Sequence, residues 1–266
     1  MILSGHNFSL AADAVFAHNY MHQGQVRYGI RTDFAPKNQD IVFCKTDFIL
    51  NLFGALQRLP VKNLGLITHE SDFAITEQLF VNRPSCIKVW YAQNIAHADP
   101  CLKPIPIGLA DAHCNITLKA DKLLRLGTVE KLLYVNHRVQ NNPRARAWIY
   151  EHFKNSDWCT VHTPDLSLDE YKSELDRHQF ILCPAGNGID THRCWEALYH
   201  GIIPIVERHL TMSTLEDLPA IVVDDFRSVT KEFLLEQYNK LQNQTTRPEK
   251  LQVEYWIQQL RQDLNA

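Results

Sequence analysis

Short apolar runs alternate along the chain, from about residue 40 onward, with longer segments in which apolar residues recur every three or four positions. Most of the short runs are continuous rather than alternating, which is typical of parallel strands that are covered on both faces. The pattern predicts eight strands, at residues 40–45, 64–68, 87–92, 132–136, 159–162, 180–184, 202–206 and 220–225.

The intervening segments have the apolar spacing of amphipathic helices. The clearest are DFILNLFGALQRL, PRARAWIYEHFKN, LDEYKSELDRH and SVTKEFLLEQYNKL. A further helix is predicted in the tail EKLQVEYWIQQLRQDL, which follows the polar linker NQTTRP. This repeated order of strand, helix and strand predicts an α/β protein with doubly wound parallel sheets.

The alternation of predicted strands and helices is interrupted once, by the polar stretch DAHCNITLKADK that follows PIPIGL, and it resumes near residue 131. We therefore predict two Rossmann-like domains, residues 1–115 and 116–245, and a C-terminal helix within 246–266. Packing of that helix back on the N-terminal domain is one arrangement open to it. A ligand of two such domains is expected between them, outside the carboxyl ends of the strands.

One stretch, CPAGNGIDTHRCWEALYHGIIPIV, places many polar residues between two apolar runs. Proline and two glycines end the buried strand before it, because proline lacks the ladder donor and glycine favours a tight turn. Asp190 or Thr191 then caps a helix that runs to about His200, and Gly201 ends it. The polar residues are thus predicted on a strand-to-helix turn.

The chemistry of this turn suits a phosphate, because a helix N-terminus offers free N–H groups and a positive dipole end. Helical geometry places Arg193 and Glu196 with His192 on one side, away from a second side that packs on the sheet. Arg193 would bind phosphate oxygens and Glu196 would accept hydrogen bonds from sugar hydroxyls, which indicates a sugar-nucleotide diphosphate. From the residues alone, an exposed polar face with an Arg193–Glu196 ion pair explains the pattern equally well.

A family resemblance extends this interpretation. The run FILCPAGNGIDTHRCWEALYHGIIPIV resembles the C-terminal motif of exostosin-like glycosyltransferases, especially the compact versions of bacteria and large DNA viruses. Earlier stretches occur in the same order as in those proteins: LITHESDFAIT, KVWYAQN, PIPIGL and YVNHRVQNNPRARAWIYEHF. The resemblance implies two facing Rossmann-like domains, the GT-B arrangement, and metal-independent transfer from a nucleotide sugar with inversion at the anomeric carbon.

The resemblance also implies roles for residues of the C-terminal half. It assigns nucleotide and diphosphate contacts to the motif residues Asn187, Gly188, Asp190, Arg193 and Glu196. Further diphosphate candidates are Arg138, just beyond LLYVN, and Arg146, in the following helix. An ordinary surface position is the equally open alternative for each of these two arginines.

The N-terminal half is expected to supply the base that takes the proton of the acceptor hydroxyl. LITHESDFAIT offers three candidates, His69, Glu70 and Asp72. Asp72 matches the acidic position of the family pattern and ranks first, although a helix N-cap would explain it as well. Asn94, after KVWYA, is a candidate for binding acceptor hydroxyls, or else a turn former.

Composition and motifs exclude several other classes. The 266 residues are 45% hydrophobic with a formal charge of −3, so there is no basic excess for binding nucleic acid. No segment has the roughly 20 apolar residues of a membrane span, and seven scattered cysteines favour reduced thiols in the cytoplasm. No D-x-D follows an apolar strand, and a zinc site from Cys183, His192 and Cys194 lacks a second closely spaced pair.

The sequence thus predicts a soluble enzyme that needs no cofactor and no metal, with the nucleotide sugar as its donor substrate and a glycan as its acceptor. The donor is a UDP- or GDP-sugar, with UDP-xylose as one example. Two alternatives stay open: a nucleotide-sugar epimerase on the same scaffold, and a catalytically idle carbohydrate-binding domain. The oligomeric state does not follow from the sequence.

Overall fold

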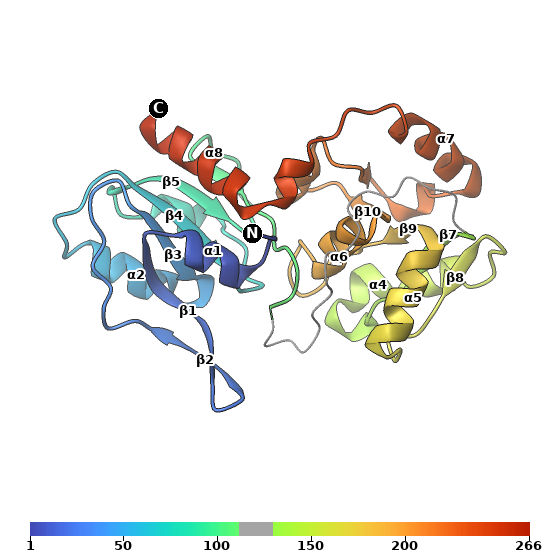
Figure 1. The fold of residues 1–266 in the computed structure, drawn as a ribbon, viewed down its shortest axis with the longest axis horizontal. Coiled ribbons are helices and arrows are strands. Elements are labelled where there is room, and N and C mark those ends of the chain that lie inside the picture. The colour runs from blue at the N-terminus through green and yellow to red at the C-terminus, as the bar shows by residue number, and fades with distance from the viewer. Residues whose placement is uncertain (112–129) are drawn as a thin grey trace. The chain divides into compact units, whose positions relative to one another are not determined.

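The computed structural model describes residues 1–111 and 130–266, and the chain divides into two compact units (Figure 1). Unit 1 comprises Met1–Thr117 with Glu249–Ala266, and unit 2 comprises Leu118–Pro248. Each unit is built on its own mainly parallel sheet. The domain boundary predicted between residues 115 and 116 lies outside the described residues.

The sheet of unit 1 has six strands in the order β2-β1-β3-β4-β5-β6. Their bounds are β1 Ala14–His22, β2 Gln25–Ile30, β3 Ile41–Lys45, β4 Leu64–His69, β5 Ile87–Ala92 and β6 Leu102–Pro104. The first two form an antiparallel hairpin, and the other neighbours are parallel. The hairpin and β6 were not predicted. Most hairpin residues are exposed, so they lack the continuous apolar run by which the buried strands were found.

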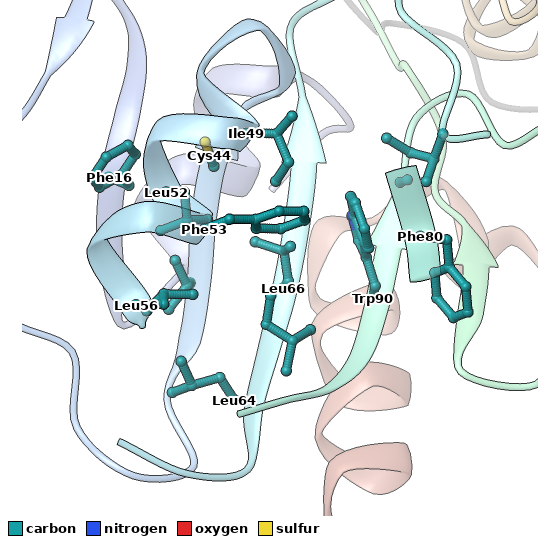
Figure 2. Close-up of a cluster of buried hydrophobic side chains, with 14 of the residues drawn as sticks. Phe16, Cys44, Ile49, Leu52, Phe53, Leu56, Leu64, Leu66, Phe80 and Trp90 are labelled. Carbon is teal, nitrogen blue, oxygen red and sulfur yellow. The ribbon is translucent and has the colours of Figure 1, made fainter. Parts of the chain in front are cut away.

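One face of this sheet is covered by α2 (Ile49–Leu56), which follows the short turn η1 (Thr46–Phe48). Figure 2 shows Leu52 and Phe53 of this helix among strand side chains that include Leu66 and Trp90. Burial of each such side chain contributes about 1.5–3 kcal/mol to the stability of unit 1. The helix α3 (Glu77–Val81) adds Phe80, which stacks on Trp90 at 6.2 Å between ring centroids.

The other face carries α1 (Gly5–Ala11) and the C-terminal helix α8 (Val253–Asn265). Contact with α8 is close at Gly65, where an added Cβ would lie 2.4 Å from Cδ2 of Leu260. Near the end of the helix, Lys88 Nζ donates to the carbonyl of Leu264 at 3.0 Å and the Tyr91 hydroxyl donates to Asp263 at 2.7 Å. The C-terminal helix therefore belongs to unit 1, although unit 2 separates it in sequence from the rest of that unit.

Unit 2 has a five-stranded, wholly parallel sheet in the order β8-β7-β9-β10-β11. The strands are β7 Lys131–Val135, β8 Cys159–Val161, β9 His178–Leu182, β10 Ile203–Glu207 and β11 Ile221–Val223. Its helices are α4 Pro143–Phe153, α5 Leu168–Arg177, α6 His192–His200 and α7 Lys231–Leu241. The described part of unit 2 also has the short 3-10 turns η3 Val139–Asn141, η4 Leu210–Leu215 and η5 Phe226–Ser228, and η6 Pro248–Leu251 leads from it into unit 1.

Helices cover both faces of this second sheet. The apolar side chains of α4 and α7 pack in one cluster with Leu133 and Phe180, whereas Tyr171 of α5 contacts Tyr134 on the opposite face. All eight predicted strands form, and so do the predicted amphipathic helices. The predicted fold class, α/β with Rossmann-like parallel sheets and a C-terminal helix, is confirmed.

Two further expectations concern the thiols and the membrane. Six cysteines lie in the described part of the chain and all six are free, while Cys114 lies outside it. Within residues 1–111 and 130–266, no helix has both the length and the apolar character required to cross a membrane.

Candidate functional site

The strand order of unit 2 reverses direction between β7 and β9, and this reversal defines a topological switch point. In open parallel sheets, ligands bind outside the carboxyl ends of the two strands that flank such a point. The loop after β7 carries His137 and Arg138, and the loop after β9 runs from Cys183 to Thr191. The donor-site residues predicted from the sequence all lie on these two loops or on the helices that follow them.

A buried arginine joins the two loops. All three guanidinium nitrogens of Arg146 donate to main-chain carbonyls: Nε to Ala185, Nη1 to Arg138 and Nη2 to Pro184, each at 2.9 Å. Burial, and then the neighbouring charge of Arg193, lowers the pKa of Arg146 to about 10. Arg146 thus has a structural role that the sequence analysis missed, and its diphosphate contact stays a prediction.

Gly186 leaves room for the guanidinium of this arginine. A Cβ at Gly186 would lie 2.8 Å from Arg146 Nη2, closer than side-chain atoms approach. The Gly186 carbonyl accepts from Asn142 Nδ2 at 3.1 Å, and its N–H donates to the carbonyl of Gly188 at 2.9 Å. The loop is therefore held by side chains of the β7 side as well as by its own turn.

The start of α6 is fixed by Asp190. This buried carboxylate accepts from the Trp195 indole N–H at 2.9 Å and from the Thr191 N–H at 2.8 Å. Thr191 is the N-cap by position, although its side chain makes no capping hydrogen bond, and Gly201 ends the helix at φ +75° as predicted. Asp190 orients the helix start from inside the protein, so its contact with a nucleotide stays a prediction.

The helix α6 is more deeply buried than predicted. A polar side free for a ligand was expected, but every residue from Cys194 to Tyr199 is buried. Glu196 accepts a hydrogen bond from the Tyr171 hydroxyl at 3.1 Å, because α5 covers the side that the helical spacing marked as polar. The prediction that Glu196 lies on an uncovered helix face is wrong, since α5 packs on it.

Arg193 lies near this pair and is only partly exposed. Its Nε is buried and has no hydrogen-bond partner in the described part of the chain. Burial acts to lower the pKa of Arg193, but Tyr171, Cys183 and Glu196 outweigh it, so the pKa is raised and the guanidinium keeps its charge. The site therefore holds a cation with an unused donor.

The remaining donor candidates differ in exposure. Asn187 and Arg138 are exposed, and Gly188 is buried within the turn. Arg138 contributes its carbonyl to Arg146 and leaves its side chain to solvent. The switch point thus presents an exposed amide and an exposed guanidinium, one on each of its two loops.

His137 is a residue of this site that the sequence analysis missed. It is fully buried, its main-chain N–H donates to the Tyr150 hydroxyl at 2.9 Å, and its Nε2 lies 3.3 Å from the carbonyl of Arg146. Burial, and then the charges of Arg193 and Arg146, lowers the pKa of His137 to about 3. The imidazole is therefore neutral at physiological pH. Its place directly before Arg138, after a buried strand, was the available signal.

In unit 1 the three base candidates follow the end of β4, and they differ sharply. His69 is buried, its Nδ1 accepts from the Glu70 N–H at 2.8 Å, and its Nε2 lies 3.0 Å from the Pro106 carbonyl, to which it donates in the matching tautomer. No ring nitrogen is left to accept a proton, which argues against His69 as the base. Asp72 is exposed, and the N-cap of the following helix α3 is Thr76, so the alternative of Asp72 as a cap is wrong.

Asn94 shapes the same loop from β5. It is buried, its Nδ2 donates to the Ser71 carbonyl at 3.4 Å, and its own carbonyl accepts from the Ile75 N–H at 2.8 Å. These contacts support the turn-forming alternative. The contact of Asn94 with acceptor hydroxyls stays a prediction.

Glu70 is the largely buried carboxyl among the three candidates. Its Oε2 accepts from the Asn19 N–H at 2.7 Å, and its Oε1 is buried without a partner among the described residues. Burial raises the pKa of Glu70 to about 7, opposed by the Asn19 hydrogen bond and assisted by the charge of Asp111.

Comparison with known proteins gives one family and several distant folds. No curated protein matched the sequence. The pneumococcal O-GlcNAc transferase GtfA, in complex with UDP and GlcNAc, is similar at 12% identity and a TM-score of 0.38, over 94% of this chain and 65% of that chain. The trehalose 6-phosphate synthase of Burkholderia multivorans matches at 12% identity and a TM-score of 0.39, over 85% of this chain and 72% of that one. A UDP-forming trehalose-phosphate synthase of Burkholderia xenovorans gives 11% identity and a TM-score of 0.40, over 85% and 73%.

The family match covers the second half of the chain. A model described as the RXYLT1 C-terminal domain matches residues 130–266, which span the whole described part of unit 2 and the C-terminal helix. This range includes both loops of the switch point and all of α6. Because the match extends over more than half of the sequence, the chain belongs to the RXYLT1 C-terminal domain family, a family of xylosyltransferases and thus of glycosyltransferase enzymes.

Proposed function

We propose that this chain transfers a sugar from a nucleoside diphosphate donor to a hydroxyl of a glycan acceptor, and that the switch point of unit 2 binds the donor. The observation that carries the proposal is Arg193, a charged arginine with a buried and unpartnered Nε beside the loop that follows β9. A buried donor without a partner costs about 1–3 kcal/mol, so a bound oxygen at this position would be stabilising.

A diphosphate meets these requirements. Phosphate oxygens accept from guanidinium groups in short, charge-assisted hydrogen bonds, and the N-terminus of α6 adds the positive end of its dipole. The negative charge on the diphosphate grows when the bond to the sugar breaks. Positive groups fixed in advance at that point stabilise the transition state, which is the largest single contribution in many enzymes.

The details of the reaction follow as part of the same proposal. Transfer proceeds with inversion at the anomeric carbon. It needs no metal ion, because Arg193 and the N-terminus of α6 neutralise the charge that a divalent cation would otherwise neutralise. A UDP-sugar such as UDP-xylose is the proposed donor, in line with the family, and a GDP-sugar is the second choice. The resemblance to exostosin-like glycosyltransferases supports the same reaction class.

Nucleotide binding provides the first test. UDP and GDP should each be titrated into the protein by calorimetry, and UDP is expected to bind and to raise the melting temperature. Arg193→Gln should lower the affinity for UDP by about 10- to 100-fold, because it removes a charge-assisted contact of about 1.5–3 kcal/mol. Arg208→Gln is the matched control, since Arg208 is an exposed arginine of unit 2 that pairs with Asp224.

Turnover provides the second test. Release of UDP from UDP-xylose should continue in the presence of EDTA, and NMR of the product should show an anomeric configuration opposite to that of the donor. The proposal fails if neither nucleotide binds, or if Arg193→Gln binds UDP as well as Arg208→Gln does. A requirement for a divalent cation would contradict the metal-independent mechanism alone.

A further inference from the structure

Strand β2 forms the outer edge of the sheet of unit 1, and the described part of the chain places no strand beyond it. It pairs with β1 in unbroken register, five of its six residues are exposed, and the turn of the hairpin projects from the rest of unit 1 (Figure 1). Sheet edges of soluble proteins are commonly protected by proline, by a bulge or by a covering segment, because a free edge pairs with other strands. β2 has neither proline nor bulge, so its edge is open to a further strand.

The hydrogen bonds of the hairpin identify the main-chain groups at this edge. The Arg31 N–H donates at 2.8 Å to the carbonyl of Phe16, which is the residue opposite it in the register of the two strands. In an antiparallel pair, alternate residues exchange hydrogen bonds with the neighbouring strand, so Gln25, Arg27 and Gly29 also bond to β1. The residues between them direct their N–H and C=O groups away from β1, and these are Val26, Tyr28 and Ile30.

The two faces of this edge differ in chemistry. Val26, Tyr28 and Ile30 have their side chains on one face, because successive side chains of a strand alternate. They are 38%, 64% and 46% exposed, so no described element covers them. Met21 lies opposite Val26 and extends this apolar face. Arg27 lies on the other face.

The hairpin is basic although the whole chain has a formal charge of −3. Residues 14–31 contain two arginines and two histidines, but neither aspartate nor glutamate. Arg31 pairs with Asp33 beyond the hairpin. The Arg27 guanidinium donates to Gln25 at 3.0 Å and has no carboxylate partner in the described ranges. A strand added at this edge would therefore meet apolar side chains on one face and an uncompensated cation on the other.

We propose that β2 binds an extended segment of another protein in which acidic and apolar residues alternate. The segment adds a strand to the sheet through the outward main-chain groups of β2. Its apolar side chains lie beside Tyr28, and its carboxylates lie beside Arg27. A second copy of this chain fits less well, because antiparallel pairing of two β2 strands would place both copies of Arg27 on one face with no carboxylate between them. The inference goes beyond the proposed function and is independent of it.

Peptide binding to the full chain provides the direct test. The probe is a capped synthetic peptide of about seven residues in which valine and glutamate alternate, a length that matches a typical strand. One control peptide has the same residues in two separate blocks, and a second has lysine in place of glutamate. In NMR titrations, the alternating peptide should bind about 10-fold more tightly than either control, because only it matches both faces of the edge.

Variants of the hairpin test the two contacts separately. Val26→Pro removes one outward N–H and no bond to β1, and Arg27→Glu reverses the charge of the polar face. Each should weaken binding of the alternating peptide by about 10-fold, and Arg27→Glu should now prefer the lysine peptide. Arg58→Glu changes an exposed arginine of unit 1 outside the hairpin, so it is the matched control and should bind as wild type does. Arg27→Glu decides the matter if proline unfolds the hairpin.

Amide hydrogen exchange tests the geometry of the edge. In the free protein, the amides of Gln25, Arg27 and Gly29 should exchange more slowly than those of the three residues with outward groups, because only the first set bonds to β1. The alternating peptide should slow exchange of the second set, Val26, Tyr28 and Ile30, by about 10-fold.

The proposal is overturned if wild-type protein does not bind the alternating peptide, or binds the block peptide equally well. It is also overturned if the peptide binds without slowing exchange at Val26, Tyr28 and Ile30. A doubling of mass with concentration in sedimentation, abolished by Val26→Pro, would assign the edge to a second copy instead. Failure to bind UDP would refute the proposed function and leave this inference standing.

Discussion

Nη2 of Arg146 lies 2.9 Å from the carbonyl oxygen of Pro184, which places a charged side chain of α4 under the loop after β9. The same guanidinium reaches the loop after β7 through the carbonyl of Arg138. One residue thus determines the distance between the two loops that flank the switch point. In our proposal, these two loops and the charged side chain of Arg193 bind the donor.

Arg146→Lys should therefore destabilise the protein, because a lysine cannot serve three carbonyls in fixed directions. We expect a loss of about 3 kcal/mol in the free energy of unfolding, from charge-assisted hydrogen bonds that are not replaced. Urea unfolding followed by circular dichroism would measure it, with Arg144→Lys on the exposed side of the same helix as the control. Equal stability of the two variants would contradict the structural role of Arg146.

Gly186→Ala should have a similar but smaller effect. The added methyl group would contact Arg146 Nη2 at 2.8 Å, so either the loop or the guanidinium must shift, at a cost of about 1 kcal/mol. Gly54→Ala provides the contrast, because Gly54 lies within α2 and has no atom within 4 Å of an added Cβ. That variant should gain about 0.5–1 kcal/mol from helix propensity. Differential scanning calorimetry should show a lower melting temperature for Gly186→Ala and a higher one for Gly54→Ala. Shifts of the same sign in the two variants would refute this account.

Glu70 should make the stability of unit 1 depend on pH. Because the pKa of Glu70 is raised from its ordinary value of 4.5 to about 7, the protonated form stabilises the fold, fully below pH 4.5, and this contribution is lost as the pH rises through 7. Glu70→Gln should therefore be more stable than wild type at pH 8, by about 1–3 kcal/mol, and nearly equal to it at pH 4.5. Denaturant titrations at the two pH values would measure both differences. A variant that is less stable at pH 8 would contradict the raised pKa.

Two buried histidines should make unit 2 sensitive to acid. Burial lowers the pKa of His137 to about 3 and that of His178 to about 4, both below the ordinary 6.5. Their contribution to stability is present above pH 6.5 and is lost as the pH falls toward 4, by up to about 1.4 kcal/mol per pH unit for each histidine. The ring of His178 stacks on Tyr134 at 4.8 Å, and a phenylalanine can keep this stack. In His178→Phe, the free energy of unfolding should therefore fall less steeply as the pH is lowered, because one fewer proton is taken up on unfolding. Melting curves between pH 7.5 and 4.5 would show it, and an unchanged pH dependence would count against this role of His178.

The fold class and most elements were accessible from the sequence because they depend on local chemistry. Continuous apolar runs such as those around Leu66 and Phe180 identify strands buried on both faces, and glycine at Gly201 identifies a helix end. The hairpin β1–β2 was missed for the same reason. Its stability depends on pairing with β3 at the edge of a sheet, and an exposed pair of strands has no distinctive apolar pattern.

The sequence by itself determined the strand-to-helix turn of unit 2, its glycines and the arginine that follows them, since these are properties of adjacent residues. Only the tertiary structure decided how each side chain is used. It brought Arg146 under Pro184, covered Glu196 with Tyr171, and buried Glu70 beside Asn19, a residue 51 positions away in the chain. Burial and hydrogen-bond partners come from segments distant in sequence, so the pKa and the free donor atoms of a residue become defined only when those segments meet.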